Sequence, residues 1–288
     1  MFPSEFEYHQ AHSIQEAIEA LGRHENAKLI AGGHSLLPMM KLRLAQPEML
    51  IDITHISGMS GIKADNGSIS IGALTTHYQA ESSDVLKRSC PVIPEAEKEV
   101  GDVQVRNRGT IGGNLAHADP ASDLPAVMLA LGAEVRAVGP RGERTITADN
   151  FFVDMLTTAL DAHEVLTEVR VPAMKPGQGA AYIKHPHPAS RYAVVGVAAV
   201  VTRDASGACT GCRVAITGAG PKAVRASATE AALTGKTLTA ENIAEAASHA
   251  ADGMDFLSDA YASEEYRAHL VRVYTRRALT AAAERAKG

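Results

Sequence analysis

Residues 31–40, "AGGHSLLPMM", place a glycine pair directly after an apolar run, and this junction decides the fold. Residues 110–119, "TIGGNLAHAD", repeat the arrangement, with an Asn after the glycines where the first stretch has a His. A single Gly-Gly pair is typical of a tight turn. Two pairs, each after a strand-like segment, indicate two loops that act on one ligand, because glycine lets the backbone approach a ligand closely.

The residues around the first pair predict a βαβ-like unit with a glycine-rich turn after its first strand. Residues 13–21 predict a helix, in which Ser13 is the N-cap and Glu16 completes a capping box. The other elements expected here are a strand in 27–33, a helix in 36–45 and a strand in 48–54.

The chain beyond this unit predicts further strands and helices, and then a change of pattern. Up to residue 172 we expect strands in 67–76, 133–138 and 164–172, helices in 77–89, 92–102 and 123–131, and a hairpin in 139–152. Residues 173–179, "AMKPGQG", are the best linker candidate. Strands at hairpin spacing and then helices in 222–233, 240–252 and 264–286 follow it, which predicts an α+β domain with helices on one face of a small antiparallel sheet.

The composition excludes several classes of protein. A length of 288 residues predicts two or three domains, and a net charge of −5 without a basic cluster argues against nucleic-acid binding. No apolar run is long enough for a transmembrane segment, and the N-terminus has no signal-peptide pattern. Three cysteines make no disulfide framework and fit a reducing compartment, so a cytoplasmic protein is expected.

The glycine loops are candidates for binding a pyrophosphate, because successive backbone N–H groups bind anions. "AGGHS" adds the Ser35 hydroxyl, and "TIGGN" adds the Thr110 hydroxyl and the Asn114 amide. The spacing fits neither the Rossmann fingerprint nor the P-loop, which disfavours an NAD domain of that type and an NTPase. Two simple tight turns remain the alternative interpretation.

Other candidate sites are weaker. His185 and His187 lack a nearby carboxylate or cysteine ligand, so surface or loop histidines are favoured over a metal site. Cys209 and Cys212 form a lone C-x-x-C, which favours packing thiols. For Asp123, helix capping together with a ligand contact is favoured over acid–base catalysis.

Four stretches together resemble the FAD-binding medium subunit of the molybdenum hydroxylases, the family of xanthine dehydrogenase and carbon monoxide dehydrogenase. They are "AGGHSLLPMMKLR" (31–43), "VRNRGTIGGNLAHADPASDLPA" (105–126), "EVLTEVRVP" (164–172) and "VAITGAGPKAVRA" (214–226). The resemblance covers nearly the whole chain. It implies an α+β fold of the vanillyl-alcohol-oxidase/PCMH type, with FAD-binding subdomains at 1–57 and 58–177 and a C-terminal α+β domain with a small antiparallel sheet at 178–288.

The resemblance also implies the positions that contact FAD, and it assigns this chain neither a catalytic residue nor a metal ligand. The first loop supplies Ala31, Gly32, Gly33, His34 and Ser35. The second supplies Thr110, Ile111, Gly112, Gly113 and Asn114, and the further positions are Asp123, Leu160, Lys184 and Tyr192. Lys184 would add a cation near the cofactor and Tyr192 an aromatic face, although a strand-core position remains the alternative for Tyr192.

The family implies an electron-transfer role within a larger complex, a dimer of heterotrimers in the cytoplasm or attached to the inner membrane face. A large subunit with a molybdopterin cofactor oxidises the substrate, and a small subunit carries [2Fe–2S] clusters that pass electrons to FAD and then to an external acceptor. Three cysteines are too few for a cluster of four thiolates, which is consistent with a flavin-only chain.

One departure concerns the holoenzyme's substrate. Where carbon monoxide dehydrogenase medium subunits have a Lys-rich segment, this chain has "KHPHPASRYA" at 184–193. A small organic substrate, such as an N-heterocycle, a purine or an aldehyde, is therefore favoured over carbon monoxide. Two rivals remain: a stand-alone flavin oxidoreductase of the same fold, and a non-enzymatic module whose glycine loops are only turns.

Overall fold

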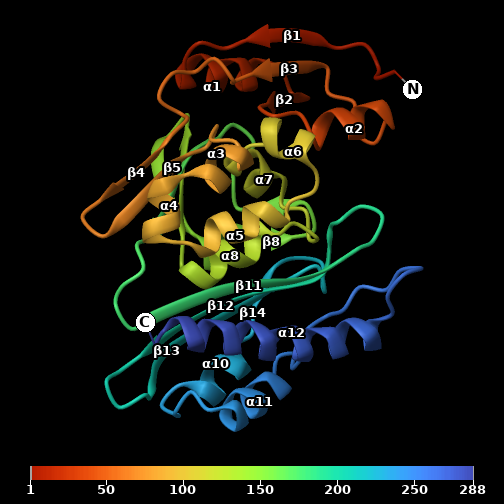
Figure 1. The fold of residues 1–288 in the computed structure, drawn as a ribbon. Coiled ribbons are helices and arrows are strands. Elements are labelled where there is room, and N and C mark those ends of the chain that lie inside the picture. The colour runs from red at the N-terminus through yellow and green to blue at the C-terminus, as the bar shows by residue number, and fades with distance from the viewer. Residues whose placement is uncertain (1, 288) are drawn as a thin grey trace.

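The structure is a computed structural model that describes residues 2–287. It contains sheets of three, five and four strands and a two-stranded ladder, arranged in the order of the chain from one end of the molecule to the other (Figure 1). This mixture of small sheets and helices confirms the predicted α+β fold class.

The first sheet is parallel, in the order β1-β3-β2. Its strands are β1 (Glu7–Gln10), β2 (Ala27–Ile30) and β3 (Met49–Asp52), and its helices are α1 (Ile14–Arg23) and α2 (Leu36–Lys41). β2, the glycine turn, α2 and β3 form the predicted βαβ unit. Ser13 caps α1 by accepting from Glu16 N–H, but the Glu16 carboxylate reaches His12 N–H and not Ser13 N–H as a capping box requires.

The second sheet is antiparallel, in the order β4-β5-β10-β6-β7. Its strands are β4 (Ile62–Asp65), β5 (Ser68–Gly72), β6 (Glu134–Gly139), β7 (Gly142–Thr147) and β10 (Val165–Pro172). The helices in this part are α3 (His77–Ser82), α4 (Asp84–Ser89), α5 (Val92–Glu99), α6 (Val103–Arg108), α7 (Ile111–His117), α8 (Leu124–Leu131) and α9 (Ala148–Phe151). The ladder of β8 (Phe152–Asp154) and β9 (Thr157–Thr158) completes it.

The third sheet is antiparallel, in the order β11-β12-β13-β14. Its strands are β11 (Gln178–Pro186), β12 (Ala193–Arg203), β13 (Cys209–Thr217) and β14 (Val224–Arg225), and its helices are α10 (Ser227–Leu233), α11 (Ala240–Ser248) and α12 (Glu264–Arg285). Helix α12 covers one face of β11 and β12, while α5 and α8 lie on the side of the second sheet (Figure 1). The linker at 173–179 precedes and enters β11.

Helix α8 joins the two larger sheets. All eight of its residues are buried, which is the pattern of a helix enclosed on every side. It packs against β10 on one side and against β12 and β13 on the other. Within residues 2–287, no helix has both the length and the apolar composition that a membrane crossing requires.

Three predicted segments differ from the structure. The helix expected over 77–89 is two helices, because Ser83 is extended and caps α4 by accepting from Leu86 N–H. Residues 103–108, for which no element was predicted, form α6. The helix expected from 222 begins only at Ser227, since residues 224–225 pair with β13 as a strand. Cys209 and Cys212 are free and buried, as predicted for packing thiols, and Cys90 is free and buried as well.

Candidate functional site

The first glycine loop presents unused backbone donors. Among residues 2–287, the N–H groups of Gly32, Gly33, His34 and Ser35 have no hydrogen-bond acceptor. Gly33 has a φ of +72°, a conformation that favours glycine, and the His34 ring donates from Nδ1 to the Gly32 carbonyl at 2.9 Å. Successive backbone N–H groups without acceptors are suited to binding an anion.

The loop lies against the chain just before the second glycine pair. A Cβ on Gly32 would come within 2.2 Å of the Arg108 carbonyl oxygen and 2.7 Å of Gly109 Cα, both of which are backbone atoms. Only glycine permits this approach. The two stretches that the sequence singled out therefore meet, although they lie far apart along the chain.

The second glycine pair is not the loop that the sequence predicted. Thr110 is the N-cap of α7, and residues 111–114 are the first turn of that helix. Their N–H groups are all used: Ile111 donates to Thr75 O at 2.9 Å, Gly112 to Ala73 O at 2.8 Å, and Gly113 and Asn114 to the Oγ1 and carbonyl oxygen of Thr110 at 3.1 and 2.9 Å.

Gly112 permits close packing of α7, and Gly113 leaves part of the first turn of α7 exposed. A Cβ on Gly112 would lie 2.5 Å from the Cβ of Ala73, so glycine lets α7 approach the end of β5. Gly113 is exposed, and the half-buried Asn114 follows it on the same turn. The first loop therefore supplies backbone N–H groups without acceptors. Helix α7 supplies the exposed Gly113 and, next to it, the side-chain amide of Asn114.

Beneath the contact lies a buried ion pair that the sequence did not reveal. His77, the first residue of α3, bonds through Nδ1 to Glu97 Oε2 of α5 at 2.7 Å, and their side chains are 3% and 0% exposed. Burial disfavours the imidazolium, but the Glu97 carboxylate outweighs this, so the pKa of His77 is raised. The Thr76–Gln79 capping box was the only local signal for this helix start.

Asp123 and Lys184 form a second buried pair, with 3.0 Å between Oδ2 and Nζ. Asp123 occupies the N-cap position of α8 but makes no side-chain cap, so the capping prediction is wrong. Its carboxylate instead accepts from Lys184 and from the Tyr182 hydroxyl. Lys184 also donates to Glu99 O at 3.0 Å and therefore ties β11 to α5.

Two further predicted positions frame the same region. Tyr192 is 46% exposed on the turn between β11 and β12, which rules out the alternative of a strand-core residue. Burial of its hydroxyl, with Asp119 and Asp123 nearby, raises the pKa of Tyr192. Leu160 is half-buried just after β9, the strand that packs against α7.

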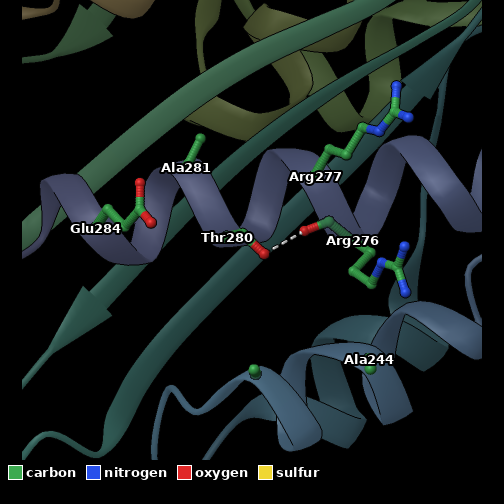
Figure 2. Close-up of a pocket in the computed structure, with 7 residues that line it drawn as sticks. Ala244, Arg276, Arg277, Thr280, Ala281 and Glu284 are labelled. Carbon is green, nitrogen blue, oxygen red and sulfur yellow. Dashed lines mark hydrogen bonds between the residues drawn. The ribbon is translucent and has the colours of Figure 1, made fainter.

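A groove on the other side of the third sheet is separate from these residues. Figure 2 shows it between α11 and α12, with Arg276 and Arg277 pointing away from each other. Its remaining lining is small or apolar apart from Thr280 and Glu284, and Thr280 donates to the Arg276 carbonyl at 2.8 Å. Residues 2–287 contain no cluster of three His, Cys, Asp or Glu side chains that could hold a metal ion. His185 lies in β11, with Nδ1 3.1 Å from the Tyr274 hydroxyl, and His187 lies in the turn that follows β11.

The class of protein follows from comparison with known families. A family model described as "FAD binding domain in molybdopterin dehydrogenase" matches residues 4–174, and one described as "CO dehydrogenase flavoprotein C-terminal domain" matches residues 180–282. The chain belongs to this family, the FAD-binding medium subunits of the molybdenum hydroxylases. It is an oxidoreductase subunit whose cofactor is FAD.

Curated relatives of equal length share this family. The carbon monoxide dehydrogenase medium chain of Hydrogenophaga pseudoflava is 41% identical over 283 residues, which is 98% of each chain. The 6-hydroxypseudooxynicotine dehydrogenase complex subunit alpha of Paenarthrobacter nicotinovorans is 38% identical and covers 100% of this chain and 97% of that one.

Solved structures of the family have the same fold. Carbon monoxide dehydrogenase from Hydrogenophaga pseudoflava superposes with a TM-score of 0.96 at 43% identity over 99% of both chains. Quinoline 2-oxidoreductase from Pseudomonas putida 86 superposes with a TM-score of 0.94 at 32% identity over the whole of both chains. The resemblance drawn from the four sequence stretches is therefore confirmed.

Proposed function

We propose that this chain binds FAD with its diphosphate at the first glycine loop. The observation that carries the proposal is the row of four unused N–H groups in residues 32–35, at a backbone contact that only glycine permits. In this proposal Thr110, Ile111, Gly112, Gly113 and Asn114 also belong to the site: they are the N-cap and first turn of α7, where Gly113 is exposed and Asn114 half-buried. Ala31, which follows β2, and Leu160, which follows β9, are the further positions that we propose contact the cofactor.

The flavin end of the cofactor belongs near the turn between β11 and β12. Tyr192 offers an exposed aromatic face there, and the buried Lys184–Asp123 pair lies beneath it. Bound FAD accepts and returns electrons, while this chain's residues hold the cofactor in place. The proposed division into subdomains 1–57 and 58–177 and a domain at 178–288 follows the separate sheets.

The holoenzyme we propose contains a large molybdopterin-binding subunit and a small subunit with [2Fe–2S] clusters, in a dimer of heterotrimers in the cytoplasm. Electrons reach FAD from the clusters and leave to an external acceptor. We infer that its substrate is a small organic molecule, because residues 185–191 read HPHPASR, whereas the family resemblance implies a Lys-rich segment for a carbon monoxide enzyme. Carbon monoxide is the second candidate, favoured by the carbon monoxide dehydrogenase relative.

The absorption spectrum of the purified chain, recorded before and after addition of FAD, tests the cofactor. We expect two flavin bands and a released cofactor identified as FAD. If neither the isolated chain nor the purified complex ever shows a flavin band, the proposed function is wrong.

The substrate is tested on the purified complex with carbon monoxide, N-heterocycles, purines and aldehydes in parallel, using an artificial electron acceptor. Turnover of an organic substrate is expected. Turnover of carbon monoxide alone would refute the proposed substrate class but leave the FAD role intact.

A further inference from the structure

The proposed FAD site lacks a cation within its loops. Neither residues 31–35 nor residues 110–114 contain Lys or Arg, yet a diphosphate brings two negative charges. Backbone N–H groups carry only partial charges, and anions bind more strongly when a charged donor assists. The nearest loop cation, Arg108, has an exposed side chain, which solvent screens.

His77 lies directly below the contact between the loops. A Cβ on Gly109 would lie 2.8 Å from His77 Cδ2 and 3.1 Å from His77 Nε2, so the ring edge touches Gly109. Gly109 in turn touches Gly32 of the first loop. The His77 backbone N–H donates to Gly109 O at 3.0 Å, which fixes this arrangement.

Only one of the two ring nitrogens of His77 forms a hydrogen bond. Nδ1 bonds to Glu97, whereas Nε2 makes no hydrogen bond among residues 2–287 although the side chain is only 3% exposed. Burial raises the pKa of Glu97, while the imidazolium of His77 favours the carboxylate form of Glu97. Its Oε1 is buried without a hydrogen-bond partner, so His77 supplies the one side-chain bond that this carboxylate makes.

Other charges near His77 occur in pairs. Glu81 of α3 faces Arg106 of α6 at 2.9 Å, and Asp123 faces Lys184 at 3.0 Å. Asp123 raises the pKa of His77, and Arg106 lowers it. Arg106 Nε and His77 Nε2 both lack a hydrogen bond among residues 2–287, but it is the edge of the His77 ring that lies against Gly109 at the glycine contact.

We propose that protonated His77, held by Glu97, is the buried cation that stabilises the diphosphate of FAD at the glycine-loop contact. This inference rests on the proposed function. His77 acts here as a binding and positioning residue: Glu97 holds the ring through Nδ1, and the ring edge that carries Nε2 lies against Gly109, which in turn touches Gly32.

The test compares FAD with riboflavin, which has the same flavin but no phosphate. Binding of each to the full-length chain is measured by fluorescence for the wild type and for His77→Gln. We expect the substitution to raise the Kd for FAD about tenfold or more and to leave the Kd for riboflavin nearly unchanged. His9→Gln is the matched control, because His9 also pairs with a glutamate, Glu16, at 3.0 Å but far from the loops.

Glu97→Gln provides a second readout, which a purely structural role of the pair would not produce. The amide keeps a partner for Nδ1 but removes the carboxylate that favours the imidazolium. We expect FAD affinity to be lost at a lower pH in this variant than in the wild type, and to be restored on acidification.

The outcomes separate the two proposals. If neither the wild-type chain nor the purified complex binds flavin, the proposed function is refuted and this inference with it. If the wild type binds FAD, three results would each overturn this inference alone. They are an unchanged FAD affinity in His77→Gln, equal losses of FAD and riboflavin affinity in His77→Gln, and an unshifted pH profile of FAD binding in Glu97→Gln.

Discussion

Replacement of Gly32 by Ala tests the backbone contact on which the site is built. The new Cβ would lie 2.2 Å from Arg108 O and 2.7 Å from Gly109 Cα, and no flexible side chain is available to move away. The first loop must separate from the chain before α7. Overpacking of this kind costs about 1–3 kcal/mol, which corresponds to a Kd for FAD raised about 5- to 150-fold if the strain falls on the FAD-bound geometry.

The assay is a fluorescence titration with FAD alongside thermal unfolding of the same sample. Gly22→Ala is the control, because Gly22 lies in α1 with nothing within 4 Å of the added Cβ. That variant should bind FAD normally and be slightly more stable, since alanine is the better helix former. Wild-type FAD affinity and wild-type stability in Gly32→Ala would refute the argument that the loops meet at this glycine.

Three other predictions concern the buried pair, a surface pair and the aromatic turn. Lys184→Met leaves Asp123 buried without its cation and should lower the free energy of unfolding by about 3–5 kcal/mol in a denaturant titration. The Arg144 guanidinium lowers the pKa of Glu164 below its usual 4.5, so the ionised carboxylate stabilises the fold above pH 4.5 and this stabilisation is lost as the pH falls through the lowered pKa. In thermal unfolding, Glu164→Gln should therefore lose less stability over that pH range than the wild type. An equal loss of stability would contradict the assignment. Tyr192→Ala should raise the Kd for FAD about 2- to 13-fold, because the aromatic ring is lost. Tyr192→Phe keeps the ring and should bind FAD as the wild type does. Equal changes in the Kd for FAD in the two variants would argue against a stacking role.

The sequence predicted the fold well where the signals are local. The apolar run before Gly32, the Ser13 cap and the hairpin spacing around β12 each involve a few neighbouring residues, and the structure has all of these features. The glycine pair at 112–113 was predicted to be a loop because glycine lets the backbone approach a ligand closely, yet it lies in a helix, although glycine has a low helix propensity. Tertiary packing overrides that preference, since α7 must approach Ala73 more closely than a side chain permits.

The chemistry beneath the loops could not be predicted in this way. His77 and Glu97 are 20 residues apart on different helices, and no motif links them. Asp123 fits a capping rule by its position before α8, but its partner Lys184 is 61 residues away. A local rule was therefore applied to a side chain whose role is set by the folded arrangement.

Helix α8 has a consequence for how this protein can be divided. Because both flanks of the helix are apolar, a fragment that ends at the linker would leave its β12 and β13 side open to water. Arg213 of β13 also caps the end of this helix by donating to Leu129 O at 2.7 Å and Ala130 O at 3.1 Å. The N-terminal part is therefore not a portable FAD module: a graft of it into another flavoprotein would have to bring the C-terminal sheet along.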